Sequence, residues 1–355
     1  MRKLALVLLP ILLVGFLTTE SMAQLNRKSI KKNNKRISHF KGKKQGFSKD
    51  KKYNSIGFSV NALNYYGDIA PRPNRVSTDI SFTRPGFGID FVHRFGPRYS
   101  LQAQFMYGVL KGSDAESADP TGENSQYRYK RNLSFRNQIK ELSTVAIFDL
   151  FKNESTYISR VKWTPYAYIG GAAFINAPKA QAPATDLTGA PLPEAGQWVK
   201  LRELGTEGQH STLDPADANY GIKPYKTVQF AIPFGVGVKF RLNEVMDLWA
   251  DIGYRYTFTD YIDDVSQDYV GLEKLKTPLA QAMSYRTNEI AGYPKNPVTT
   301  PSGIAVEAGY GHQNAPGSPE PFNMRGSKND RDIYLVTSIR LTYILGASFH
   351  KAKFR

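Results

Sequence analysis

Apolar side chains alternate with small or polar ones along several stretches of this 355-residue chain. The clearest stretch, 228–240, carries an apolar residue at every second position: Val228, Phe230, Ile232, Phe234, Val236, Val238 and Phe240. A period of two predicts a strand with one apolar face. Its length exceeds that of most soluble strands and suits a tilted strand in a bilayer, which needs roughly 9–11 residues in the hydrocarbon.

Seven further segments show the same alternation, at 55–66, 86–95, 100–110, 133–151, 164–174, 247–259 and 332–345. Within 133–151 the apolar residues change parity near Lys140 and Glu141, which predicts a β-bulge. Pro233 has no amide N–H to donate, so a bulge or a missing hydrogen bond is expected beside it.

The connections between these segments alternate between long and short. The turns at 96–98 and 243–244 are short and the link at 152–162 is moderate, whereas the links at 67–85, 111–132, 175–227 and 260–331 are long. Outer-membrane barrels have short periplasmic turns and long outer loops. The pattern therefore predicts an all-β fold, an eight-stranded antiparallel transmembrane up-and-down β-barrel over 53–348 with long extracellular loops and both termini periplasmic. Helical turns are expected near 270–276.

The N-terminus reads as a secretory signal over 1–23, with a basic start, an apolar segment at 4–17 and small residues before Gln24. A membrane anchor is the alternative. Residues 24–52 follow with twelve Lys or Arg against Asp50, so this arm carries +11 of the net charge of +16. Such a segment is predicted to be a disordered periplasmic arm, and residues 349–355 a periplasmic tail.

Export disfavours nucleic acid as the partner of this arm, and an acidic protein or anionic lipid is expected instead; a functionless solvated tail is the alternative. The candidate partner-binding residues are Arg27, Lys28, Lys31, Lys32, Lys35, Arg36, Lys41, Lys43 and Lys44.

Six charged residues fall on the predicted inner face of the strands: Asp90, Arg136, Glu141, Asp251, Arg255 and Arg340. An eight-stranded barrel is narrow enough for its own side chains to fill it. Because isolated buried charges are costly, these residues are expected to form an ion-pair network in the lumen. A path for protons or ions is the alternative.

Candidate catalytic chemistry is sparse. The chain has no cysteine. Some barrels of this size are enzymes that modify lipid A with a Ser/His/acid set at the outer rim. Here His93 is the only histidine in a predicted strand, and it lies near a short turn, away from a substrate in the outer leaflet. Asp260, Asp263, Asp264 and Asp268 could hold Ca²⁺, but a solvated acidic loop is the favoured interpretation. We therefore expect no enzyme, no cofactor and no metal site.

Two stretches resemble a known family. Asn64–Ile69 resembles the "YxGD" signature of the PorG-like outer-membrane barrels of Bacteroidetes, and Asn132–Ser143 is similar to a strand of that family that carries Leu-Ser-Phe. The segments 165–171 and 233–237 also fit. The residues that match the family motif are Tyr66, Gly67, Asp68, Leu133, Ser134 and Phe135.

The resemblance implies a barrel of the type IX secretion and gliding machinery that ties periplasmic ring and lipoprotein subunits to the outer membrane. The basic arm and the long loops depart from that family. The leading hypothesis is a non-enzymatic outer-membrane barrel that anchors or organises a type IX-like secretion complex, with outer-membrane lipids and those subunits as partners. The alternative is a surface adhesion or ligand-binding barrel that acts through its long loops, with Trp198, Tyr269 and Tyr285 as contacts.

Overall fold

The computed structural model describes residues 47, 51–69, 82–122, 125–217, 219–308, 324–328 and 330–345. All of them belong to one compact unit, 47–355. The predicted signal segment, the nine candidate partner-binding residues of the arm and the tail at 349–355 lie outside the described residues.

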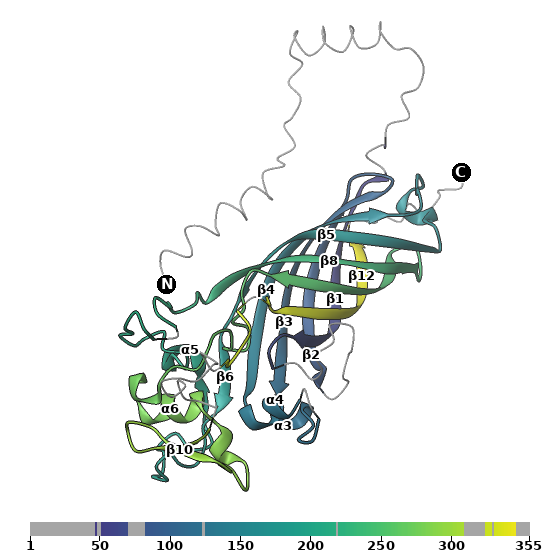
Figure 1. Ribbon diagram of the computed structural model, residues 1–355. Helices are drawn as coiled ribbons and strands as arrows, with labels where there is room; N and C mark the ends of the chain where they lie inside the picture. Colours follow the sequence, from purple (N-terminus) through teal and green to yellow (C-terminus); the bar gives the residue numbers. More distant parts are fainter. Residues whose placement is uncertain are drawn as a thin grey trace, which may run out of the picture. The chain divides into compact units, whose positions relative to one another are not determined.

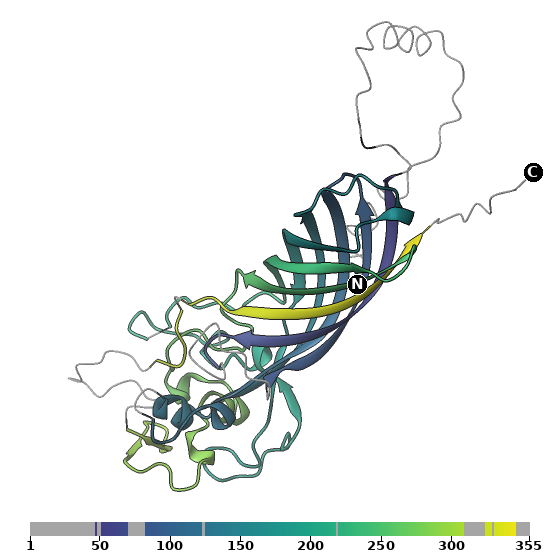
Figure 2. The same cartoon turned by 90° about the vertical axis from the view of Figure 1, so that its right-hand side faces the viewer.

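Eight long antiparallel strands form the barrel: β1 (Tyr53–Tyr66), β2 (Arg84–Arg94), β3 (Tyr99–Ser113), β4 (Ser134–Asp149), β5 (Trp163–Ile175), β8 (Val228–Arg241), β9 (Met246–Thr257) and β12 (Ile333–Leu345). They pair in the order β3-β2-β1-β12-β9-β8-β5-β4, and β3 also pairs with β4. The sheet is therefore closed, as Figures 1 and 2 show. The predicted fold class is confirmed, and each predicted strand matches an observed one within a few residues.

The two ends of the barrel differ. One end carries the short turns 95–98 and 242–245 and the link 150–162, and we call it the turn end; the other, the loop end, carries the long connections. Between them the outer surface is a belt of exposed apolar side chains. On β8, for example, Phe230 and Val236 are 60% and 58% exposed, although such side chains are normally buried. Exposure of this extent on every strand fits contact with lipid.

The predicted bulge in β4 is absent, because the pairing of β4 with β3 runs without a break from Ser134 to Phe148. Inward and outward positions alternate along the whole strand. What changes near Lys140 is the surroundings. Toward the turn end the apolar residues face outward to lipid, whereas toward the loop end Phe135 and Ile139 face inward to a buried core. Arg136 therefore points outward, and its predicted place in the lumen is wrong.

The predicted defect at Pro233 is confirmed as a gap in pairing. The ladder between β5 and β8 stops after Ile169–Phe234 and resumes at Ala172–Ala231 with the same register. On its other side Pro233 still pairs with Arg255 of β9. The missing amide N–H thus interrupts one ladder without shifting any side chain to the other face.

The long connections fold over the loop end as an ordered cap, which we define as the described residues of 175–227 and 260–331. With the shorter loop 114–133 the cap contains these elements: α3 (Asp114–Ser117), α4 (Gln126–Arg131), β6 (Pro178–Gln181), β7 (Trp198–Lys200), α5 (Leu201–Leu204), η4 (Leu272–Lys274), α6 (Pro278–Ser284), η5 (Thr287–Glu289), β10 (Pro297–Thr299) and β11 (Ala305–Glu307). A further turn, η3 (Tyr157–Ser159), lies at the turn end. Helical turns were expected near 270–276, where η4 is found. No helix among the described residues is both long and apolar enough to span a bilayer.

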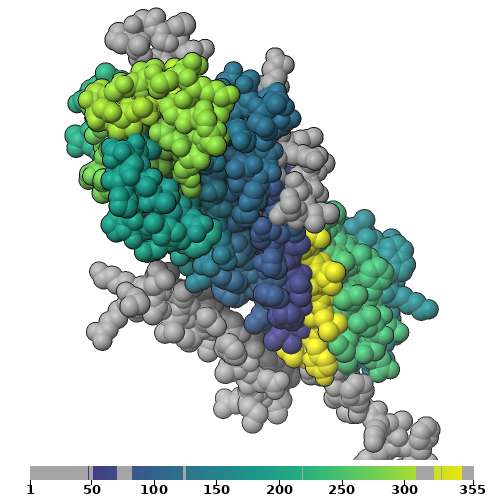
Figure 3. Space-filling model, turned by 90° about the horizontal axis from the view of Figure 1, so that it is seen from below, coloured from purple at the N-terminus to yellow at the C-terminus, as the bar shows by residue number. Residues whose placement is uncertain are grey.

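The cap has a hydrophobic core that includes Val270, Tyr285 and Val306. A second cluster joins cap residues such as Met283 to inward barrel residues such as Phe135. Figure 3 shows the cap segments packed against one another and against the loop that follows β3. The prediction that Tyr269 and Tyr285 make surface contacts is wrong, because both side chains are buried, whereas Trp198 is exposed.

Candidate functional site

The lumen is filled at mid-height by paired charges. Arg340 of β12 lies 3.2 Å from Asp90 of β2 and 3.3 Å from Asp251 of β9. Its guanidinium also donates to Oε1 of Gln102 at 2.8 Å, and Gln102 donates in turn to Asp90 at 2.7 Å. Both carboxylates therefore share one arginine, as burial of charge requires.

A second group of charges lies beside the first, toward the loop end. Glu141 is 3.5 Å from Nε of Arg255 and accepts a 2.6 Å hydrogen bond from the hydroxyl of Tyr334. The structure thus brings together five of the six predicted lumen charges and leaves out Arg136. The cavity between Gln102, Asp251 and their neighbours measures about 10 Å³, which is room for about one water molecule. The network leaves no path for a solute.

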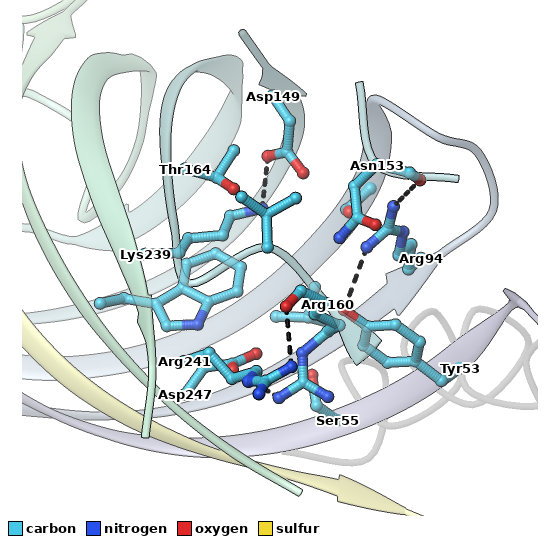
Figure 4. Close-up of a pocket in the computed structure, with 14 residues that line it drawn as sticks. Tyr53, Ser55, Arg94, Asp149, Asn153, Arg160, Thr164, Lys239, Arg241 and Asp247 are labelled. Carbon is cyan, nitrogen blue, oxygen red and sulfur yellow. Dashed lines mark hydrogen bonds and ion pairs between the residues drawn. The ribbon is translucent and has the colours of Figure 1, made fainter. Parts of the chain in front are cut away.

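The turn end holds a cluster that sequence reasoning missed (Figure 4). Arg94 donates to the carbonyls of Gly96 and Asn153 at 3.1 and 2.6 Å. Arg160 donates to the carbonyl of Glu244 at 2.7 Å and pairs with Asp247 at 2.6 Å. These two side chains tie the turns and the link of this end to one another.

Two further cations complete this cluster. Lys239 lies 2.5 Å from Asp149 with its ammonium 4.3 Å from the ring centroid of Trp249, and Arg241 donates to the carbonyl of Arg160 at 2.8 Å. Four cations therefore meet two carboxylates around a cavity of about 30 Å³, which holds about two water molecules. The cluster carries a net positive charge, but Arg94 and Arg160 are buried, and the cavity has no room for an organic ligand. The signal in the sequence was a basic residue at the end of two strands beside the short turns, Arg94 of β2 and Arg241 of β8.

The family-motif residues meet at the loop end, at the junction of cap and barrel. The ring of Phe135 packs edge-on against Tyr65 at 4.7 Å between centroids. Arg131, which precedes the second motif, donates to the carbonyl of Asp68 at 2.7 Å and holds Asp114 through two hydrogen bonds of 2.7 and 2.8 Å. The amide of Leu133 donates to the same carboxylate at 3.1 Å. The two motifs are thus two halves of one junction.

The remaining motif residues serve the same junction. A Cβ at Gly67 would lie 1.9 Å from both the hydroxyl of Tyr65 and Oδ1 of Asp332, so only glycine fits there. The carboxylate of Asp68 accepts from the amide of Ser327 at 3.0 Å. Tyr66 is buried, and Ser134 accepts from Arg286 at 3.4 Å.

The four aspartates considered as a calcium site or as a solvated acidic loop differ in exposure, and Asp260 and Asp268 are half-buried. Asp263 and Asp264 are fully buried. Asp264 accepts from the hydroxyls of Thr206 and Tyr225 at 2.5 and 2.6 Å. Among the described residues, no group of three or more acidic or histidine side chains is arranged to hold a metal ion.

Burial raises the pKa of several of these carboxyls, because the charged form loses its hydration. The pKa of Asp263 rises to about 8 through burial and the nearby Asp68. The pKa of Asp260 rises to about 9, again chiefly through burial. The pKa of Asp264, which faces Arg325, reaches about 6. The junction therefore carries bound protons at neutral pH.

The closed eight-stranded sheet and its apolar belt define a β-barrel of the outer-membrane type. A family model described as "Domain of unknown function (DUF6089)" matches residues 45–181, the part that contains both motifs. Among curated proteins, none matches this sequence.

Three solved outer-membrane or surface proteins are similar to the chain. The attachment invasion locus protein Ail of Yersinia pestis has 7% identity and a TM-score of 0.33, over 83% of this chain and 99% of its own. Neisserial surface protein A has 9% identity and a TM-score of 0.32, over 82% and 96%. A major outer membrane protein of Thermus thermophilus has 12% identity and a TM-score of 0.34, over 82% and 99%. The barrel assignment itself rests on the strand pairing.

Proposed function

We propose that this protein is a non-enzymatic outer-membrane barrel that anchors or organises a periplasmic protein complex of the type IX secretion kind. The turn end faces the periplasm in this proposal, in keeping with short periplasmic turns in such barrels. The resemblance to PorG-like barrels suggests the kind of complex.

The observation that carries the proposal is the closed lumen. Arg340 bridges Asp90 and Asp251 across the barrel, and the cavity beside them has room for no more than about one water molecule. Transport through the barrel is therefore disfavoured, and the functional residues are expected at the two ends of the barrel. At the turn end, the cationic cluster around Arg94 and Arg160 lies next to Tyr53, the residue that follows the basic arm. Arg94 and Arg160 are buried, so the cluster adds only its net charge, and the basic arm would supply the exposed cations that steer an acidic partner.

The test compares full-length protein with a variant in which 24–52 is replaced by a neutral Gly/Ser segment of equal length. Both are expressed in the native membrane, crosslinked and captured, and the periplasmic proteins retained are quantified. We expect the variant to retain fewer ring or lipoprotein subunits than the full-length protein does. This difference should become smaller at high salt, because screening also weakens the contact that the wild-type arm makes. An unchanged set of partners would refute the role of the arm.

A second candidate function is binding at the cell surface through the cap. The observation that favours it is that the cap has its own core and exposes Trp198 and Tyr220, which are 48% and 61% accessible. Ordered aromatic side chains are frequent anchors in binding surfaces. Because the cap also packs into the barrel mouth, deletion of the loops would disturb the barrel. Trp198→Ala with Tyr220→Ala is the cleaner test, and under this candidate it reduces surface binding while secretion persists.

A further inference from the structure

A row of four basic residues crosses the outer face at the loop end. The strand register places Lys111 of β3 opposite Arg136 of β4, Arg136 opposite Lys179 of β6, and Lys179 opposite Lys200 of β7. Residues opposite each other in an antiparallel sheet point to the same face, and these four alternate with inward, buried neighbours. We call them the basic row.

The basic row is costly for the folded protein by itself. Neighbouring strands lie about 4.8 Å apart, so the four cations follow one another within about 15 Å. Like charges directly opposite each other destabilise a sheet. Glu116 pairs with Lys111 at 2.7 Å and Glu203 with Lys200 at 2.7 Å, which compensates the two ends of the row. Within the described residues, the central pair Arg136 and Lys179 has no ion pair.

The position of the basic row relative to the apolar belt indicates what could compensate it. Along β4 toward the turn end, the outward residues after Arg136 are Gln138, Lys140 and then Leu142, which is 50% exposed and begins the belt. At about 3.3 Å per residue, Arg136 lies about 13 Å beyond Lys140. The row therefore lies outside the hydrocarbon, on the headgroup side of the belt. The guanidinium of Arg136 is 5.7 Å from the ring of Trp198, an aromatic residue suited to that interface.

We propose that the basic row binds the phosphate groups of a glycolipid in the outer leaflet, with the acyl chains against the apolar belt. An amphiphile with an anionic head matches both features at once, since the cations continue directly from the lipid-facing strand surface. Arginine suits phosphate because its planar guanidinium donates in pairs. This lipid-binding proposal rests on the proposed function in one respect only, which is that the turn end faces the periplasm and the loop end faces outward.

The test uses the full-length protein in a neutral detergent. Diphosphorylated lipid A, the same glycolipid without phosphates, and inorganic phosphate are each titrated in, and bound lipid is counted by native mass spectrometry. The variant Arg136→Gln with Lys179→Gln removes the unpaired centre of the row. The matched control, Lys152→Gln with Lys162→Gln, removes two exposed cations from the turn end.

We expect the row variant to bind phosphorylated lipid A about thirtyfold more weakly, which corresponds to ~1 kcal/mol for each cation removed. The control should bind like the wild type, and the dephosphorylated glycolipid should bind no better than the row variant binds lipid A. The row variant should unfold at the same temperature as the wild type or higher, because it relieves like-charge repulsion. A large fall in that temperature would contradict the energetic argument.

Equal affinity of the row variant and the wild type would overturn the proposal, as would equal binding of the two glycolipids. Displacement of lipid A by inorganic phosphate at matched phosphate concentration would overturn it as well, because it would mark a site for soluble anions. These outcomes are separate from the proposed function. Loss of lipid binding with periplasmic partners retained, or the reverse, shows which of the two proposals has failed.

Discussion

The hydroxyl of Tyr65 lies 2.7 Å from Oδ2 of Asp263 at the junction of barrel and cap. The same hydroxyl lies 2.5 Å from Oδ1 of Asp332. A tyrosine hydroxyl has one hydrogen to donate, so it can bond both carboxyls only if one of them is protonated and donates to it. The geometry therefore requires a shared proton, which agrees with the raised pKa values of both aspartates.

The first prediction concerns pH. The pKa of Asp263 is about 8 in the folded protein, against about 3.9 in an unfolded chain. The folded junction thus holds a proton that the unfolded chain releases. Stability from this group is full below about pH 4 and falls as the pH rises through 8. We expect limited proteolysis of the cap to accelerate between pH 6 and pH 9.

In Asp263→Asn the side chain stays neutral, so the rise in proteolysis with pH should become shallower. Asp186→Asn is the control, because Asp186 is a half-exposed residue of the cap and its pKa is lowered by hydrogen bonds from Thr188. A pH profile in Asp263→Asn as steep as that of the wild type would contradict the shared proton.

The second prediction concerns Gly67. A methyl group there would overlap the Tyr65 hydroxyl and the Asp332 carboxylate, both of which are fixed by hydrogen bonds. Gly67→Ala should therefore destabilise the protein by about 1–3 kcal/mol, as overpacking of a core does. Thermal unfolding in detergent, followed by circular dichroism, measures the effect. Gly171→Ala is the matched control in a strand, where no atom lies within 4 Å of the added carbon, and it should not lower the unfolding temperature.

The third prediction concerns Arg131, which joins the carboxylate of Asp114 to the carbonyls of Asp68 and Arg325. Arg131→Met removes both hydrogen bonds of the guanidinium to the buried Asp114, whose remaining ion-pair partner is Arg128 at 3.6 Å, and should cost about 3 kcal/mol. Lys152→Met breaks an exposed pair with Glu154 and should cost about 0–1 kcal/mol. Denaturant unfolding in detergent compares the two, and similar losses would show that the junction does not depend on Arg131.

The strands could be predicted from the sequence because lipid enforces strict alternation over their lengths. The alternation gave the wrong face for Arg136, because β4 passes from the lipid-facing part of the barrel into the capped mouth. Its apolar residues face lipid toward the turn end, whereas Phe135 and Ile139 face the capped mouth. A change of apolar parity thus marks the exit from the membrane as readily as a bulge.

The cap and the junction could not be predicted for a different reason. The contacts that bury Asp263 and Tyr285 come from residues far away along the chain, as in the bond between Tyr65 and Asp263. The loops have no periodic pattern that reveals such partners. The motif segments at 64–69 and 132–143 were visible as a resemblance, but the bond of Arg131 to Asp68, which joins them, was not.

The last prediction concerns the lumen. Because Arg340 bridges Asp90 and Asp251 across it, the reconstituted protein should give no swelling of liposomes in small sugars beyond that of lipid alone. Asp90→Ala with Asp251→Ala and Arg340→Ala removes the bridge and all three charges together, so no buried charge of this group is left unpaired. If this variant remains folded and admits sugars, the bridge is the barrier. If it remains folded and stays tight, the bridge is not needed for closure, and the second charge group around Glu141 and Arg255 or the cap closes the barrel. Swelling with the wild-type protein would contradict a closed lumen altogether.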